Sequence, residues 1–151
     1  RYIGIDWSES HRLVKFKNRI LPWVAEAPMC DAPYMSKDEI MAWAISEGLE
    51  PPALYKAGFK HNNCGGACIK AGQAQWALLL QHDPLRYARW EQWENKMRER
   101  VGNHSILRNR RKKDLTALKK STPLTLTDFR LRVQAKQNID QQEFGGCNCG
   151  F

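Results

Sequence analysis

Four of the chain's five cysteines lie in two short glycine-rich segments, and this pattern constrains the fold more than any other feature of the sequence. In residues 61–70, Cys64 and Cys68 flank two glycines, and near the other end of the chain Cys147 and Cys149 follow another glycine pair. Glycine adopts backbone conformations that other residues avoid, so both segments can turn tightly enough for several thiolates to converge. The pattern therefore predicts that the two segments meet at a shared metal centre.

Four thiolates are a ligand set that suits either zinc or an iron-sulfur cluster. The spacing of Cys64 and Cys68 fits zinc, but Cys147 and Cys149 are closer together than in the commonest zinc sites. A cuboidal 4Fe-4S cluster is larger and less dependent on spacing, so we favour it, with zinc and no metal as alternatives. A different chemistry would use Cys147 or Cys149 as a nucleophile, with Cys64 or Cys68 resolving the intermediate.

The composition and charge of the chain indicate how large a core it can form and what kind of partner it could bind. The chain has 151 residues, of which 42% are hydrophobic, enough for one ordinary core without a metal. It carries 24 Lys and Arg against 16 Asp and Glu, a formal charge of +8, which suits a polyanionic partner such as nucleic acid or a nucleotide. The alternative is a generically basic protein, because charge does not specify a fold.

The sequence shows neither a membrane span nor a secretion signal. No apolar run approaches the roughly 18 residues that cross a bilayer, and the beginning lacks signal-peptide architecture. We therefore expect a cytoplasmic protein that does not contact membranes, and in that reducing compartment closely spaced cysteines are typical of metal or catalytic sites. Because the chain begins at Arg1 in a strand-like run, we also expect a preceding segment.

The first 25 residues suggest a strand, a helix and a second strand. Tyr2–Ile5 is apolar and partly β-branched, Ser8 can cap a helix that extends through Arg19, and Pro22–Ala25 could be a further short strand. Open α/β sheets bind ligands at the carboxyl ends of their strands, which makes four polar residues candidates for a ligand site: Asp6, Glu9, His11 and Arg12. The alternative is a solvated helix start whose acidic residues match the helix dipole.

The rest of the sequence is mainly helical in pattern. Four helices are expected: one after a capping box of Ser36 and Glu39, one over 73–81, one over 84–101 capped by Asp83, and one over 128–137 capped by Thr127. Trp76, Trp90 and Trp93 have helical spacing that favours core packing over base stacking. The basic run 108–113 could contact phosphates or form a solvated loop. Cys30 has no cysteine neighbour and is expected to be a half-buried or buried small hydrophobe.

Several short motifs follow one another over residues 1–80: Gly4-Ile5, Glu9-Ser10, Arg12, Asp38-Glu39-Ile40, Pro51, Leu54-Tyr55, Gly58-Phe59 and the Cys64 segment. Their order resembles the phosphoadenosine phosphosulfate reductase family, which belongs to the PP-loop ATP-pyrophosphatase-like superfamily. The resemblance implies that Arg12 faces phosphate or sulfate, and that the pyrophosphate loop lies in the expected preceding segment. Asp6 stands where many of these reductases have arginine, and the paired tail cysteines replace their single catalytic cysteine.

The resemblance implies an α/β fold: an incomplete Rossmann-like PP-loop domain with a helical, cysteine-bearing carboxyl-terminal part. Residues 1–59 would complete the nucleotide-binding domain, and residues 60–151 would form a helical cysteine-cluster region packed on it. We expect an enzyme that binds an adenine nucleotide or sulfonucleotide and acts in sulfur transfer or sulfonucleotide reduction. The alternative is a non-catalytic, metal-stapled basic module that binds nucleic acid.

Overall fold

The computed structural model describes residues 1–60, 62–109, 122–141 and 144–145. It is mixed α/β, mostly helical with one small two-stranded sheet. The described residues divide into two compact units, one within Arg1–Pro51 and the other within Pro52–Cys147. Each unit is described below by itself.

In the first unit, short helices follow an extended start. A 3₁₀ turn, η1 (Trp7–Glu9), leads into α1 (Ser10–Arg19), and a second turn, η2 (Pro28–Cys30), precedes α2 (Lys37–Ser46). The expected capping box of α2 is confirmed, because Ser36 Oγ accepts from Glu39 N and Glu39 Oε2 accepts from Ser36 N. The expected cap at Ser8 is wrong. Asp6 caps the turn instead, and its Oδ1 accepts from Ser8 N at 2.8 Å.

The two strands expected in this unit are reduced to a single contact. Tyr2 and Glu26 form an isolated parallel bridge, supported by Ile3 N donating to Glu26 O at 2.9 Å. No longer ladder forms among the described residues of Arg1–Pro51. The physical reason is that parallel strands are stable when both of their faces are covered, whereas Tyr2 and Val24 of these segments are 77% and 73% exposed.

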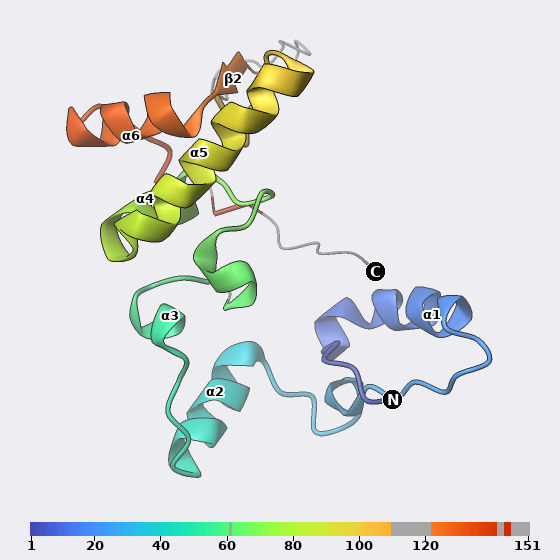
Figure 1. Cartoon of the computed structure of the whole chain (residues 1–151). Helices are drawn as coiled ribbons and strands as arrows, with labels where there is room; N and C mark the ends of the chain where they lie inside the picture. The colour runs from blue at the N-terminus through green and yellow to red at the C-terminus, as the bar shows by residue number, and fades with distance from the viewer. Residues whose placement is uncertain (61, 110–121, 142–143, 146–151) are drawn as a thin grey trace, which may run out of the picture. The chain divides into compact units, whose positions relative to one another are not determined.

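The second unit is a three-helix arrangement with a small sheet (Figure 1). After the one-turn α3 (Ala53–Lys56) and the 3₁₀ turn η3 (Asn63–Gly66), the helices α4 (Gln73–His82), α5 (Pro84–Val101) and α6 (Leu126–Gln134) pack against one another. β1 (Leu107–Asn109) pairs antiparallel with β2 (Thr122–Leu124), with Leu107 opposite Leu124. The helices expected over 73–81 and 84–101 are confirmed.

The core of this unit is aromatic. Trp76, Tyr87 and Phe129 are fully buried, one from each of the three helices. The last helix begins earlier than expected: Thr125, not Thr127, is its cap, and its Oγ1 accepts from Asp128 N at 3.0 Å. Because the helix starts at Leu126, that leucine is buried in the core. The stabilisation from this burial cannot be recognised from a local capping pattern.

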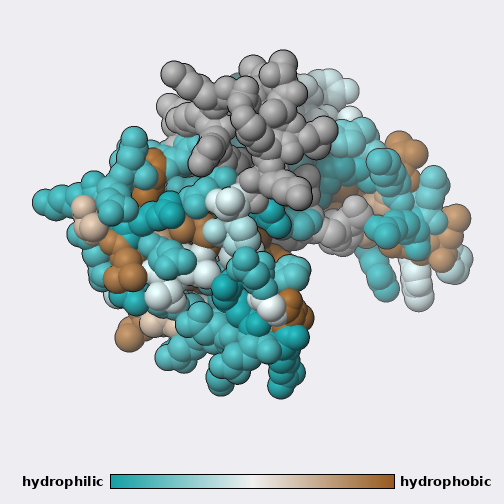
Figure 2. Space-filling view, turned by 90° about the horizontal axis from the view of Figure 1, so that it is seen from above, coloured by the Kyte–Doolittle hydropathy of each residue, from teal (hydrophilic) through white to brown (hydrophobic). Residues whose placement is uncertain are grey.

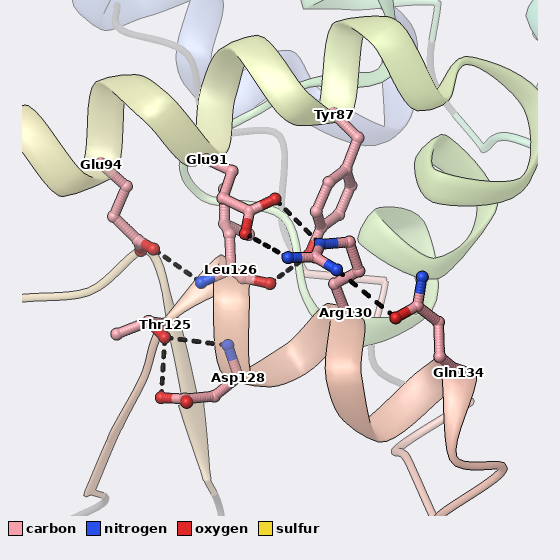
Figure 3. Close-up of polar contacts among 8 residues, drawn as sticks. All are labelled: Tyr87, Glu91, Glu94, Thr125, Leu126, Asp128, Arg130 and Gln134. Carbon is pink, nitrogen blue, oxygen red and sulfur yellow. Dashed lines mark hydrogen bonds and ion pairs between the residues drawn. The ribbon is translucent and has the colours of Figure 1, made fainter.

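Polar side chains join α5 to α6 around this core (Figure 3). Arg130 donates from Nε and Nη2 to the two carboxylate oxygens of Glu91, both at 3.0 Å, and Tyr87 Oη donates to Leu126 O at 2.7 Å. Glu94 is 5% exposed, and its carboxylate accepts from the backbone N–H groups of Ile106 and Leu126 at 2.8 and 2.6 Å. Burial, helped by the charges of Glu91 and Glu94, raises the pKa of Tyr87 far above its usual value.

The face drawn in Figure 2 is largely hydrophilic. On the face drawn in Figure 2, hydrophobic residues occur in small groups among hydrophilic ones. Of the helices described, none has both the length and the apolar character needed to span a bilayer.

Candidate metal centre

The loop that carries the first cysteine pair has an unusual backbone. Cys64 has φ 56° and ψ 15°, a left-handed conformation that costs a non-glycine residue free energy. Gly65 and Gly66 continue in the same region, with φ values of 56° and 82°. Strained residues of this kind persist where the surrounding structure holds them, and they concentrate at functional sites. We call residues 62–68 the cysteine loop.

Two side chains from the helices that follow hold the cysteine loop in this conformation. Gln75, 2% exposed on α4, donates from Nε2 to Gly66 O at 2.8 Å. Arg86, in the first turn of α5, donates from Nη1 to Gly65 O at 2.9 Å. Both bonds satisfy carbonyl groups that the tight turn removes from regular secondary structure.

Close packing explains why glycines follow Cys64. A Cβ at Gly66 would lie 2.8 Å from Cε1 of Phe59, which is itself buried, and one at Gly65 would overlap the guanidinium group of Arg86. The positive φ therefore favours glycine at both positions, and lack of space beside the buried Phe59 ring adds a second constraint at Gly66.

The two described cysteines of the site differ in environment. Cys68 is 6% exposed and belongs to the hydrophobic core cluster, whereas Cys64 is exposed. Both are free thiols. A ligand bound by both would therefore sit at the surface of the core, with its inner side against the unit and its outer side open to further ligands.

The carboxyl-terminal tail returns to this loop. Gly145 forms an isolated antiparallel bridge with Ala71, and Gly72 N donates to Phe144 O at 3.0 Å. Ala71 N in turn donates to Cys68 O at 2.9 Å, so the bridge lies one tight turn from the second cysteine. Lys60 adds a cation–π contact, with Nζ 4.4 Å from the ring centroid of Phe144.

The covalent chain limits how far the tail cysteines can be from this bridge. Cys147 and Cys149 lie outside the described residues, but they follow Gly145 by two and four positions. An extended chain spans at most about 3.6 Å per residue, so two residues reach at most about 7 Å. Among the described residues, no three His, Cys, Asp or Glu side chains gather as a metal site, and two of the four predicted ligands fall beyond that part of the chain.

The four residues expected at a nucleotide site lie together at the start of the first unit. Asp6 caps η1, and Glu9 Oε2 pairs with Arg12 Nη1 at 2.5 Å. Asp6, Glu9 and Arg12 are half-buried, and His11 is exposed on α1. The structure thus brings Glu9 and Arg12 into direct contact and commits Asp6 to the backbone of the following turn. Cys30 is half-buried as expected, with Sγ 3.3 Å from Ile5 O.

Sequence reasoning missed the residues that support the cysteine loop. Gln75 and Arg86 act across 9 and 21 residues, and no local pattern marks them. Gly145 could be recognised in the sequence, because it begins the glycine pair before Cys147. Of the basic run 108–113, only Arg108 and Asn109 are described, and both belong to β1.

Comparison with known proteins identified no relatives: no protein-family model, no curated protein and no solved structure matches the chain.

Proposed function

We propose that Cys64, Cys68, Cys147 and Cys149 together hold a metal centre, either an iron-sulfur cluster or zinc. The observation that carries this proposal is the bridge between Ala71 and Gly145, which anchors the tail beside the loop that contains Cys64 and Cys68. The strained conformation of Cys64 supports it, because a metal ligand is one reason to hold a cysteine in this way. Arg86, bonded to Gly65, adds a cation that would offset the negative charge of the thiolates.

We further propose that this centre belongs to an enzyme that resembles the phosphoadenosine phosphosulfate reductase family. The parallel bridge between Tyr2 and Glu26 supports an α/β nucleotide-binding region, since parallel pairing across an intervening helix is the connection found in βαβ units. Asp6, Glu9, His11 and Arg12 follow the first of these segments, the position where such folds bind ligands. The enzyme would bind an adenine nucleotide or sulfonucleotide and act in sulfur transfer or sulfonucleotide reduction.

The metal centre is tested by purifying the chain without oxygen and measuring its visible spectrum and its iron and zinc content. Cys64→Ser, Cys68→Ser, Cys147→Ser and Cys149→Ser should each lose the metal. Cys30→Ser is the matched control and should keep it, because Cys30 has no cysteine neighbour in the sequence and its Sγ lies 3.3 Å from Ile5 O. A metal-free wild-type protein, or four serine variants with full metal content, would refute the centre. Lost activity with full metal content in Cys149→Ser would indicate a nucleophile instead.

The nucleotide site is tested separately by calorimetric titration with an adenylyl sulfate. Arg12→Ala should weaken binding by about 1.5–3 kcal/mol, because a guanidinium contact to phosphate or sulfate is charge-assisted. Arg19→Ala, an exposed position in the last turn of the same helix, should leave the affinity unchanged. Equal affinities of the two variants would show that Arg12 does not contact the nucleotide.

A further inference from the structure

The second unit contains a pocket of about 370 Å³ that the proposed metal centre does not use. Its walls come from the segment after the cysteine loop, from one face of α5 and from the residues that lead into β1. The lining includes Ile69, Trp90, Trp93, Met97, His104 and Ile106. The lining is mainly apolar, with a few polar groups, as in pockets that bind small organic molecules.

Tryptophans lead from the core to this pocket. Trp76 is fully buried and meets Trp90 edge to face, with ring centroids 6.0 Å apart. Trp90 is half-buried and meets Trp93 in the same way at 5.1 Å. Trp93 is 56% exposed. Core packing therefore explains the position of Trp76 but not that of Trp93, much of which is in contact with water. Met97 and Ile69 are also exposed, at 59% and 61%.

The pocket is held open by hydrogen bonds that fix its two walls to each other. Glu94 of α5 accepts from Ile106 N at 2.8 Å, and Arg98 of α5 donates to His104 O and, at 3.3 Å, to Asn103 Oδ1. These bonds tie residues 103–106 to the last two turns of the helix. A preformed site of this kind loses little conformational freedom when a ligand binds.

The end of α5 beside this pocket carries an excess of positive charge. Residues 96–109 contain four Lys and Arg and one Glu, a net charge of +3. Lys96 and Arg100 are exposed and follow Trp93 and Met97 by three positions, on the same side of α5. The pocket residues Met97, Arg98 and His104 lie within this stretch. The complementary partner is therefore a polyanion that also presents flat apolar rings.

We propose that this pocket binds an unpaired base of a single-stranded nucleic acid. Trp93 provides the stacking surface, Met97 and Ile69 complete the apolar contact, and the exposed cations Lys96 and Arg100 contact the phosphates on either side. A duplex is excluded from this mode because its base faces are already stacked on one another. This site uses none of the four proposed metal ligands, although Ile69 directly follows Cys68.

The test is fluorescence anisotropy with a labelled 12-nucleotide single-stranded DNA, at several salt concentrations, with the full chain. Trp93→Ala should weaken binding about 5- to 100-fold, the range for loss of one stacked base. Trp93→Phe should retain most of the affinity, because phenylalanine keeps an aromatic face. Trp43→Ala is the matched control, since Trp43 is 57% exposed and lies in the first unit.

Three results would overturn the proposal. The first is equal affinity of Trp93→Ala and Trp43→Ala, provided that both keep the thermal transition of the wild type. The second is binding of a 12-base-pair duplex as tightly as the single strand. The third is displacement of the probe by polyglutamate as effectively as by unlabelled single-stranded DNA, which would show that charge alone is recognised.

Discussion

Gly145 pairs with Ala71 in an isolated antiparallel bridge, and the backbone there is too crowded for any side chain at residue 145. A Cβ at this position would lie 2.6 Å from Gly72 N and would also overlap Lys70 O, both of which are backbone atoms. Gly145 has φ 72° as well. The positive φ and the lack of space for a Cβ therefore both favour glycine at residue 145, where the tail meets the segment that follows Cys68.

Gly145→Ala should break this bridge and lower the metal content of the purified chain. The left-handed conformation alone costs alanine about 1–2 kcal/mol, and the backbone overlap adds to that cost. Iron and zinc analysis together with thermal unfolding measures both effects. Gly58→Ala is the control: its φ of 87° imposes similar backbone strain, but nothing lies within 4 Å of its Cβ. Equal metal loss in both variants would show that the bridge is not what positions the tail.

Gln75→Leu should destabilise the cysteine loop. It removes the donor to Gly66 O, and an unsatisfied buried carbonyl costs about 1–3 kcal/mol. Chemical denaturation measures the loss, and iodoacetamide labelling of Cys64 and Cys68 should become faster. Gln92→Leu, an exposed change on α5, should alter neither quantity. Unchanged labelling in Gln75→Leu would mean that other contacts hold the loop.

Glu94→Gln should destabilise the second unit by about 2–3 kcal/mol. Its carboxylate accepts from two backbone N–H groups, and an amide has only one oxygen to offer, so one buried donor would face the NH₂ group. Urea unfolding followed by circular dichroism measures the change. Glu99→Gln removes the same charge from an exposed position of the same helix and should have little effect.

The ion pair of Glu91 and Arg130 should make stability depend on pH. The hydrogen bonds from Arg130 lower the pKa of Glu91 below its ordinary value of 4.5. A carboxyl group with a lowered pKa contributes stability above its unfolded-state value, and that contribution is lost as the pH falls through the folded-state value. Arg130→Met should therefore be less stable than the wild type at pH 7, by about 1 kcal/mol, with the difference shrinking toward pH 3. A difference that stays constant with pH would argue against the ion pair.

Local sequence patterns were sufficient for the helices that have clear caps. The capping box at Ser36, the Asp83-Pro84 start of α5 and the end of α5 at Gly102 all appear as expected, because caps act within one turn. The same reasoning failed at α6 and in the first unit. There, the burial of Leu126 and the exposure of Tyr2 and Val24, all properties of the tertiary structure, decided the outcome.

The three tryptophans show the same division between sequence and structure. Helical spacing predicted core packing for all of them, and Trp76 confirms it with no exposed surface. Trp93 is the exception, because the helix turns it to the rim of a pocket whose other walls come from distant segments. Spacing along one helix specifies a face, but it does not specify what covers that face.

For the candidate metal centre, the sequence alone determined the ligand types, since glycine-flanked cysteines in pairs are chemically suited to bind a metal. Only the tertiary structure decided that residues 144 and 145 return to the segment that follows Cys68, and that Gln75 and Arg86 hold Cys64 in a left-handed turn. The physical reason is that thiolate chemistry is a property of each residue, whereas convergence depends on hydrogen bonds between segments far apart in the chain.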